Sequence, residues 1–158
     1  MARELVVLWA GRHRRDSWSS LCDDYAKRIK RTIRIRDSPI KVRKTSEDRA
    51  RLRSEGQALL AAVPADAWLV ALDRRGKMQS STEMASWLQG LIDDWPGQIV
   101  FLLGSDLGLD TAVLDKARTR LSLSPLTLPH ELARLVLYEQ IYRSIGIQAG
   151  IKYHREPL

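Results

Sequence analysis

The chain has 158 residues, of which 44% are hydrophobic and 28% are charged, a balance typical of one folded domain spanning residues 1–158. This composition excludes a disordered or collagen-like protein, and the single cysteine, Cys22, excludes an internal disulfide. No apolar run approaches the roughly 20 residues that a membrane-spanning helix needs. The run at residues 5–10 is also too short for a signal peptide, so we expect a cytoplasmic protein.

The formal net charge is +7, and the positive excess is concentrated in the first third of the chain. Residues 1–53 contain 16 Lys or Arg against 7 Asp or Glu, whereas the remainder is slightly acidic. Such a segment predicts a surface that binds the phosphates of a nucleic acid. The alternative is a well-solvated basic surface without a partner.

The first half of the chain alternates between strand and helix patterns. A continuous apolar run predicts a buried strand at residues 5–9, and a helix capped by Asp16 follows it. Alternation at residues 32–42 predicts a half-exposed strand near a sheet edge, and residues 48–62 are rich in helix formers. The expected apolar face of the first helix consists of Trp18, Leu21, Cys22, Tyr25 and Ile29.

The next strand and helix have clear boundaries. Residues 68–72 form a second continuous apolar run, which we expect to end at the polar residues 73–76. Ser80 and Glu83 have the spacing of a capping box, which predicts the start of a helix. An apolar stripe continues from there to residue 95, where Pro96 and a following glycine end the helix.

The same alternation continues to the end of the chain. Residues 99–103 predict a third apolar strand, and a helix over residues 110–118 would be capped by its first residue, an aspartate. A short strand is expected at residues 121–123. The last long helix begins near Pro129 and is expected to end at Gly146.

This order of elements predicts an α/β fold. Apolar strands without alternation have both faces covered, which indicates a mainly parallel sheet with helices on both faces. Ligands of such sheets bind at the carboxyl ends of the strands, near a topological switch point. The loops after residues 72, 103 and 123 are therefore the candidate binding region.

Two of these loops have unusual composition. Gly104 and Gly108 allow a close backbone approach and a positive φ, which a ligand-binding turn needs, although an ordinary tight turn is the alternative. In residues 122–131, Pro125 and Pro129 hold the intervening segment extended. Its unpaired backbone groups would suit the edge of an adenine ring, with Leu126 and Leu128 against the ring faces; the alternative is a structural crossover loop.

The three histidines give no metal site. His13 lies in the basic segment, His130 at a helix start and His154 in the terminal tail, and no cysteine–histidine cluster accompanies them. The chain also lacks a phosphate-binding Walker loop and a convincing Ser-His-Asp spacing. We expect no metal.

Together these segments identify a family resemblance. The chain resembles the small SPOUT-class methyltransferases that methylate N3 of a pseudouridine in bacterial 23S rRNA. The matching segments are ELVVLWAGR, DYAKRI, LDRRGKMQSSTEMASWL, LLGSDLGL, LSPLTLPHELARLVLYEQIYRSIGIQAG and YHR. They span nearly the whole chain in order, and the block over residues 126–154 is the most specific.

The resemblance implies a fold, a methyl donor and partners. The carboxyl-terminal segment of the α/β sheet would be threaded into a deep trefoil knot, an exception to the usual absence of knots. S-adenosylmethionine would bind in this knot as the methyl donor. The enzyme would be a homodimer whose site draws on both subunits, and 23S rRNA or the ribosome would be its substrate.

The resemblance also implies roles for individual residues. The tail residues Tyr153, His154 and Arg155 would lie beside the donor's methyl group and the target base as the catalytic group. Arg143 and the basic residues Arg12, Arg14 and Arg15 would contact RNA. The donor pocket would use Leu72, Gly104, Ser105, Leu123, Ser124, Pro125, Leu126, Thr127 and Leu128.

One departure from the family pattern concerns the donor loop. Family members usually have two adjacent glycines where this chain has Gly104 and Ser105. If the second position needs a positive φ, Ser105 would be strained by about 1 kcal/mol; alternatively, its hydroxyl would bind the donor. The competing functions are a non-catalytic RNA- or ribosome-binding protein that retains the fold, and a flavodoxin-like regulatory domain.

Overall fold

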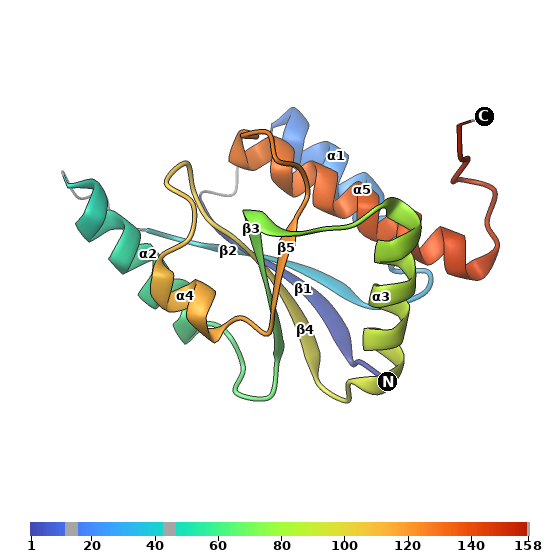
Figure 1. Cartoon of the computed structure of the whole chain (residues 1–158), viewed down its shortest axis with the longest axis horizontal. Helices are drawn as coiled ribbons and strands as arrows, with labels where there is room; N and C mark the ends of the chain where they lie inside the picture. Colours follow the sequence, from blue (N-terminus) through green and yellow to red (C-terminus); the bar gives the residue numbers. More distant parts are fainter. Residues whose placement is uncertain (12–15, 43–46, 158) are drawn as a thin grey trace.

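A computed structural model describes residues 1–11, 16–42 and 47–157 of the chain. Five parallel strands form one sheet in the order β2-β1-β4-β3-β5, and helices cover both of its faces (Figure 1). The predicted parallel α/β fold is thus confirmed. The elements are β1 (Glu4–Ala10), α1 (Ser17–Ile29), β2 (Ile35–Ile40), α2 (Asp48–Ala61), β3 (Trp68–Met78), α3 (Ser81–Asp94), β4 (Gln98–Leu103), α4 (Thr111–Lys116), β5 (Thr119–Ser122) and α5 (His130–Ala149).

The sheet separates two hydrophobic cores. Helices α1, α3 and α5 pack together on one face, and α2 packs with α4 on the other. In β1, Leu5 and Val7 face the first core while Val6 and Leu8 face the second, so every residue of this run is buried. None of the described helices combines the length and apolar composition that crossing a membrane requires.

The predicted edge strand and the start of α1 are confirmed. Among the described strands β2 pairs with β1 alone, and it is shorter than predicted, spanning Ile35–Ile40 rather than residues 32–42. Its Pro39 lacks a backbone N–H and is tolerated because an edge strand does not bond on its outer side. The Asp16 carboxylate accepts a hydrogen bond from the backbone N–H of Ser19 and caps α1.

The predicted apolar face of α1 is partly wrong. Cys22 and Ile29 are buried, but Trp18 is 36% exposed and Leu21 is 47% exposed. Both side chains therefore remain partly open to solvent. The sequence pattern gives the polarity of a helix face but not whether its own chain covers that face.

Strand β3 is longer than predicted. Instead of ending at residue 72 it continues to Met78, with a break in register after Leu72 and renewed pairing of Lys77 with Leu121. Gly76 is needed at the break, because a Cβ there would lie 2.7 Å from the backbone of Arg120. Residues 73–76 therefore form a polar bulge, and the extension escaped prediction because its side chains are mostly exposed.

The boundaries of α4 and β5 also differ from the prediction. Helix α4 spans Thr111–Lys116 rather than residues 110–118, and Asp110 occupies the N-cap position without a side-chain capping bond. Strand β5 spans Thr119–Ser122 rather than residues 121–123. Pairing begins early because the backbone N–H of Arg118 donates to the carbonyl of Leu69 on the neighbouring strand.

Helix α5 does not end at Gly146. It continues to Ala149, and Gly150 ends it with a φ of +70°. Gly146 is buried within the helix, and its carbonyl accepts a hydrogen bond from the N–H of Ile151 in the tail. The tail thus folds back against the last turn of the helix.

Candidate functional site

A cavity of about 850 Å³ lies at the carboxyl ends of β3, β4 and β5. Three loops build it: the β3 bulge, the glycine turn after β4, defined as residues 104–108, and the segment between β5 and α5. The volume is within the range of about 300–1,000 Å³ that is typical of pockets for small molecules and cofactors. The three loops are those that the strand order identifies as the binding region.

The predicted donor-binding residues lie together around this cavity, except Pro125, which does not form part of its wall. Those that line it are Leu72, Gly104, Ser105, Leu123, Ser124, Leu126, Thr127 and Leu128. The wall also includes Asp73, Arg74 and Arg75 of the β3 bulge, and His130 at the start of α5, none of which we assigned to the pocket. The bulge residues could have been predicted to line the pocket, because they directly follow Leu72, which we assigned to it.

The glycine turn has no room for a side chain at its first position. A Cβ on Gly104 would lie 2.0 Å from the carbonyl oxygen of Gly108. Gly108 itself has a φ of +78°, and its N–H donates to the carbonyl of Ser105 at 2.9 Å. These contacts fold the turn tightly against itself at the wall of the cavity.

Ser105 is not strained, because no described residue other than glycine has a positive φ. Its hydroxyl instead donates to Oε2 of Glu55 in α2 at 2.6 Å. Glu55 is only 3% exposed, and the sequence analysis did not identify it as a site residue. In the sequence, Glu55 could have been noticed as a carboxylate within a predicted helix to which we assigned only a structural role.

The segment between β5 and α5 bends at Pro125 and Leu126, so the prediction of an extended segment is wrong there, but it presents backbone groups without a backbone partner. Among the described residues, the backbone atoms of residues 125–128 have no backbone partner, and the N–H of Leu126 donates to the hydroxyl of Ser124 at 2.9 Å. Arg74 of the β3 bulge donates to Thr127 Oγ1 at 3.2 Å and so joins two walls of the cavity. Polar backbone edges and the exposed side chain of Leu126 are thus available to a ligand.

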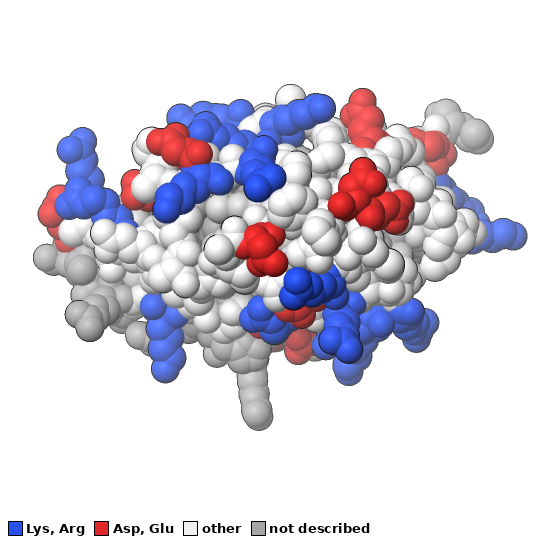
Figure 2. Space-filling view, turned by 90° about the horizontal axis from the view of Figure 1, so that it is seen from below, with Lys and Arg blue, Asp and Glu red and all other residues white. Residues whose placement is uncertain are grey.

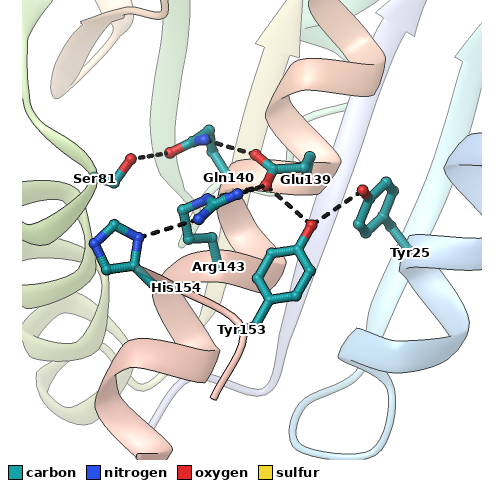
Figure 3. A network of polar contacts seen from close by, with 7 residues as sticks. All are labelled: Tyr25, Ser81, Glu139, Gln140, Arg143, Tyr153 and His154. Atoms are coloured by element: carbon teal, nitrogen blue, oxygen red, sulfur yellow. Dashed lines mark hydrogen bonds and ion pairs between the residues drawn. The ribbon is translucent and has the colours of Figure 1, made fainter. Parts of the chain in front are cut away.

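A second polar network joins the middle of α5 to the tail that follows the helix (Figure 3). The hydroxyl of Tyr153 donates to Glu139 and lies 3.2 Å from the hydroxyl of Tyr25. Arg143 pairs with the same carboxylate and donates to Nδ1 of His154 at 3.1 Å. Burial, together with the hydrogen bonds from Tyr25 and to Glu139, raises the pKa of Tyr153 well above its usual value, so the phenol is neutral.

The hydrogen bonds of His154 define its protonation. Because a guanidinium can only donate, Nδ1 of His154 must accept, and its proton lies on Nε2. Nε2 is 2.8 Å from the carboxylate of Glu156 and donates to it.

Within one chain the tail and the cavity are not brought together. Neither Tyr153 nor His154 lines the cavity, and Arg155 is exposed. The tail folds back along α5 and is bonded to Glu139 and Arg143 in the middle of the helix, whereas the cavity reaches α5 at its first turn. The expectation that the tail lies beside the donor pocket is not met by a single subunit.

Of the four predicted RNA-binding residues, one lies in the part of the chain that the structure describes. Arg12, Arg14 and Arg15 lie outside the described residues, and Arg143 belongs to the tail network. The face at the amino ends of the strands carries both acidic and basic side chains (Figure 2). The positive excess is therefore not gathered into a single patch on that face.

Comparison with known proteins places the chain in a family. The family model described as "Predicted SPOUT methyltransferase" matches residues 4–154. A protein of Solidesulfovibrio magneticus named ribosomal RNA large subunit methyltransferase H is 39% identical over 96% of this chain and 99% of its own length. A protein of the same name from Gloeobacter violaceus is 38% identical over 95% of this chain and 97% of its own.

Solved structures agree with this assignment at the level of the fold. A probable methyltransferase from Bordetella pertussis superimposes with a TM-score of 0.54 over 91% of this chain and 96% of its own, at 14% identity. A probable methylase family protein from Haemophilus influenzae gives a TM-score of 0.51 over 98% of this chain and 71% of its own, at 13% identity. From the family match and the near full-length relatives, we conclude that the chain belongs to the SPOUT methyltransferase family.

Proposed function

We propose that this protein transfers a methyl group from S-adenosylmethionine to N3 of a pseudouridine in 23S rRNA of the large ribosomal subunit. The observation that carries this proposal is the cavity at the carboxyl ends of the strands, enclosed by the glycine turn and the segment between β5 and α5. The names of the near full-length relatives support an rRNA substrate. Pseudouridine specificity and the trefoil knot rest on the family resemblance, and a cytoplasmic location rests on the sequence.

The residues around the cavity fit this donor. The backbone groups of residues 125–128 that have no partner in the chain suit the polar edge of an adenine ring, and the leucines of the same segment suit its faces. The turn beside them depends on Gly104, because a Cβ there would meet the carbonyl of Gly108. Bound there, S-adenosylmethionine would supply an activated methyl group, so the protein's main task is to position the base and remove its N3 proton.

The tail residues have the chemistry for that task. In our proposal His154 accepts the N3 proton at Nδ1, which requires that Nδ1 first give up its hydrogen bond from Arg143. Arg155 favours the developing anion of the base by its positive charge, and Tyr153 orients the base through its neutral phenol. Arg143, which already contacts His154, holds the tail in place and contacts RNA.

A homodimer would bring the tail to the cavity. The exposed apolar side chains Trp18 and Leu21 on α1 and Ile151 after α5 favour a contact between the α1–α5 layers of two subunits. If two α5 helices lie antiparallel across a two-fold axis, the end of one lies beside the start of the other. The tail of each subunit would then complete the cavity of its partner.

Complementation between two inactive variants tests this shared site. Gly104→Val disrupts the turn that forms a wall of the cavity and His154→Ala removes the base, so we expect each homodimer to be inactive. A refolded equimolar mixture contains about half heterodimers, each with one intact site, and should recover about a quarter of the wild-type rate. If the mixture stays inactive, although heterodimers form, the site does not draw on both subunits.

The alternative of a non-catalytic RNA-binding protein loses its main argument. That argument was strain at Ser105, and Ser105 has an ordinary backbone conformation. Calorimetric titration with S-adenosylmethionine should show saturable binding, and rRNA from a strain that lacks the protein should lack one methylated pseudouridine by mass spectrometry. Absence of binding heat, with every rRNA methylation intact, would favour the binding protein.

A further inference from the structure

We propose that Glu55 and Arg51 of α2 are positioning residues that hold the glycine turn in its donor-binding conformation, and so set the affinity for the methyl donor. This inference rests on the proposed function, because it concerns the same cavity. It assigns a role to a helix on the opposite face of the sheet from α5, with no contact to the tail.

The first contact joins a buried carboxylate to the turn. The side chain of Glu55 is 4% exposed, and its Oε2 accepts the hydroxyl proton of Ser105 at 2.6 Å. Its Oε1 lies 3.8 Å from Nε of Arg51, one helical turn earlier. A buried carboxylate costs free energy unless it is paired, and its partners here are this arginine and the turn.

The second contact joins the same helix to the next residue of the turn. Nη2 of Arg51 donates to both carboxylate oxygens of Asp106, at 2.9 and 3.0 Å. The hydrogen bond from Arg51 is the main cause that lowers the pKa of Asp106 below its usual value. Two adjacent residues of the turn are thus attached to two residues of α2.

The Ser105 hydroxyl links the helix to the interior of the turn. While it donates to Glu55, it accepts a hydrogen bond from the backbone N–H of Leu107 at 3.3 Å. A hydroxyl can do both at once, whereas a glycine at this position can do neither. In this chain Ser105 therefore transmits the position of α2 to the backbone that forms the cavity wall.

The close approach of α2 makes this connection stiff. A Cβ added to Gly56, the neighbour of Glu55, would lie 3.0 Å from Cβ of Asp110, just beyond the turn. The helix therefore packs directly against the loop, without long side chains between them. Movement of the turn requires breaking its contacts with α2.

This arrangement predicts an effect on donor binding without an effect on the chemical step. Glu55 and Arg51 do not line the donor cavity, so losing their contacts should loosen the turn without removing a group from the reacting atoms. The dissociation constant and the KM for S-adenosylmethionine should rise together, while kcat stays near the wild-type value.

The test is a double-mutant cycle between Glu55 and Ser105. Glu55→Ala and Ser105→Gly should each weaken calorimetric binding of S-adenosylmethionine and its demethylated product about tenfold, and the double variant should be little worse than either single variant. Glu55→Gln keeps an oxygen acceptor for the serine hydroxyl and should restore most of the affinity. Arg3→Ala removes an exposed ion pair with Asp66 at the other end of the sheet and should leave binding unchanged.

A second measurement does not depend on activity or on the donor. Amide hydrogen exchange in residues 104–109 of the ligand-free protein should be faster in Glu55→Ala and near wild type in Glu55→Gln. Unchanged exchange, additive losses of affinity in the cycle, or a loss of kcat at unchanged donor affinity would each overturn the inference. If Glu55→Ala does not fold, the Ser105→Gly and Glu55→Gln comparisons decide, because neither adds bulk.

The result can be distinguished from failure of the proposed function. If the wild-type protein binds neither S-adenosylmethionine nor its product, the proposed function is wrong, whatever the variants do. The exchange measurement would still establish whether α2 holds the turn. If the wild type binds and only the cycle is additive, the positioning role alone is wrong.

Discussion

Gly104 and Gly90 differ in whether a side chain would fit at their position. Gly104 lies where a Cβ would meet the carbonyl oxygen of Gly108 at 2.0 Å, whereas a Cβ on Gly90 in α3 would meet no other atom within 4 Å. The first glycine allows two backbone segments to touch. The second lies on an exposed part of a helix, where glycine only increases the freedom of the unfolded chain.

We therefore predict that alanine has opposite effects at these positions. Gly104→Ala should lower the free energy of unfolding by about 1–3 kcal/mol because the turn must open, and it should also weaken donor binding. Gly90→Ala should raise the free energy of unfolding by about 0.5–1 kcal/mol and leave binding unchanged. Urea denaturation and calorimetry measure both quantities, and a Gly104→Ala protein of wild-type stability would show that the turn has room to move.

The sequence could not reveal the partner of Ser105. Its spacing next to Gly104 predicted a binding turn, and the two explanations considered were backbone strain and a bond to the donor. The hydroxyl instead bonds to Glu55, 50 positions earlier in the chain. Such a contact depends on how α2 packs against the turn, and local sequence patterns do not contain that information.

At the scale of elements, the prediction succeeded where hydrophobic periodicity determines structure. The central strands β1 and β4 are buried on both faces, so their apolar runs define them almost to the residue. The capping box of α3 also formed as predicted, because its hydrogen bonds are local. The polar extension of β3 and the passage of α5 beyond Gly146 depend instead on pairing with β5 and packing of the tail, which have no local pattern.

The attachment of the tail to α5 has a testable pH dependence. The pKa of Tyr153 is raised by burial and by its hydrogen bonds, so in alkaline solution the unfolded chain loses this proton before the folded protein does. The stabilising effect of the network is therefore complete below about pH 10, the usual pKa of tyrosine, and is lost as pH rises above it.

We expect Tyr153→Phe to remove this contribution. Between pH 8 and pH 11, the variant should lose less free energy of unfolding than the wild-type protein, as measured by urea denaturation at each pH. Buried Tyr138, whose pKa is also raised, is present in both proteins and cancels in the comparison. Equal losses would indicate that the hydroxyl of Tyr153 is not held by the network.

At the scale of the whole molecule, the partly uncovered face of α1 predicts the effect of a charge there. Leu21→Glu places a carboxylate where the proposed dimer buries an apolar side chain, and should weaken association roughly a hundredfold. Sedimentation should then show monomers at micromolar concentration, and methyl transfer should fall with the loss of dimers. Gln57→Glu adds the same charge on an exposed position of α2 and should leave the dimer intact.

The length of α5, 20 residues, is constrained by more than the packing of the helix. In the proposed dimer this helix sets how far each tail extends toward the neighbouring subunit, and each added residue would shift the tail by about 1.5 Å and rotate it by about 100°. An insertion would therefore misplace both sites of the dimer at once. Lineages of this protein should tolerate changes of length in surface loops far more readily than in α5.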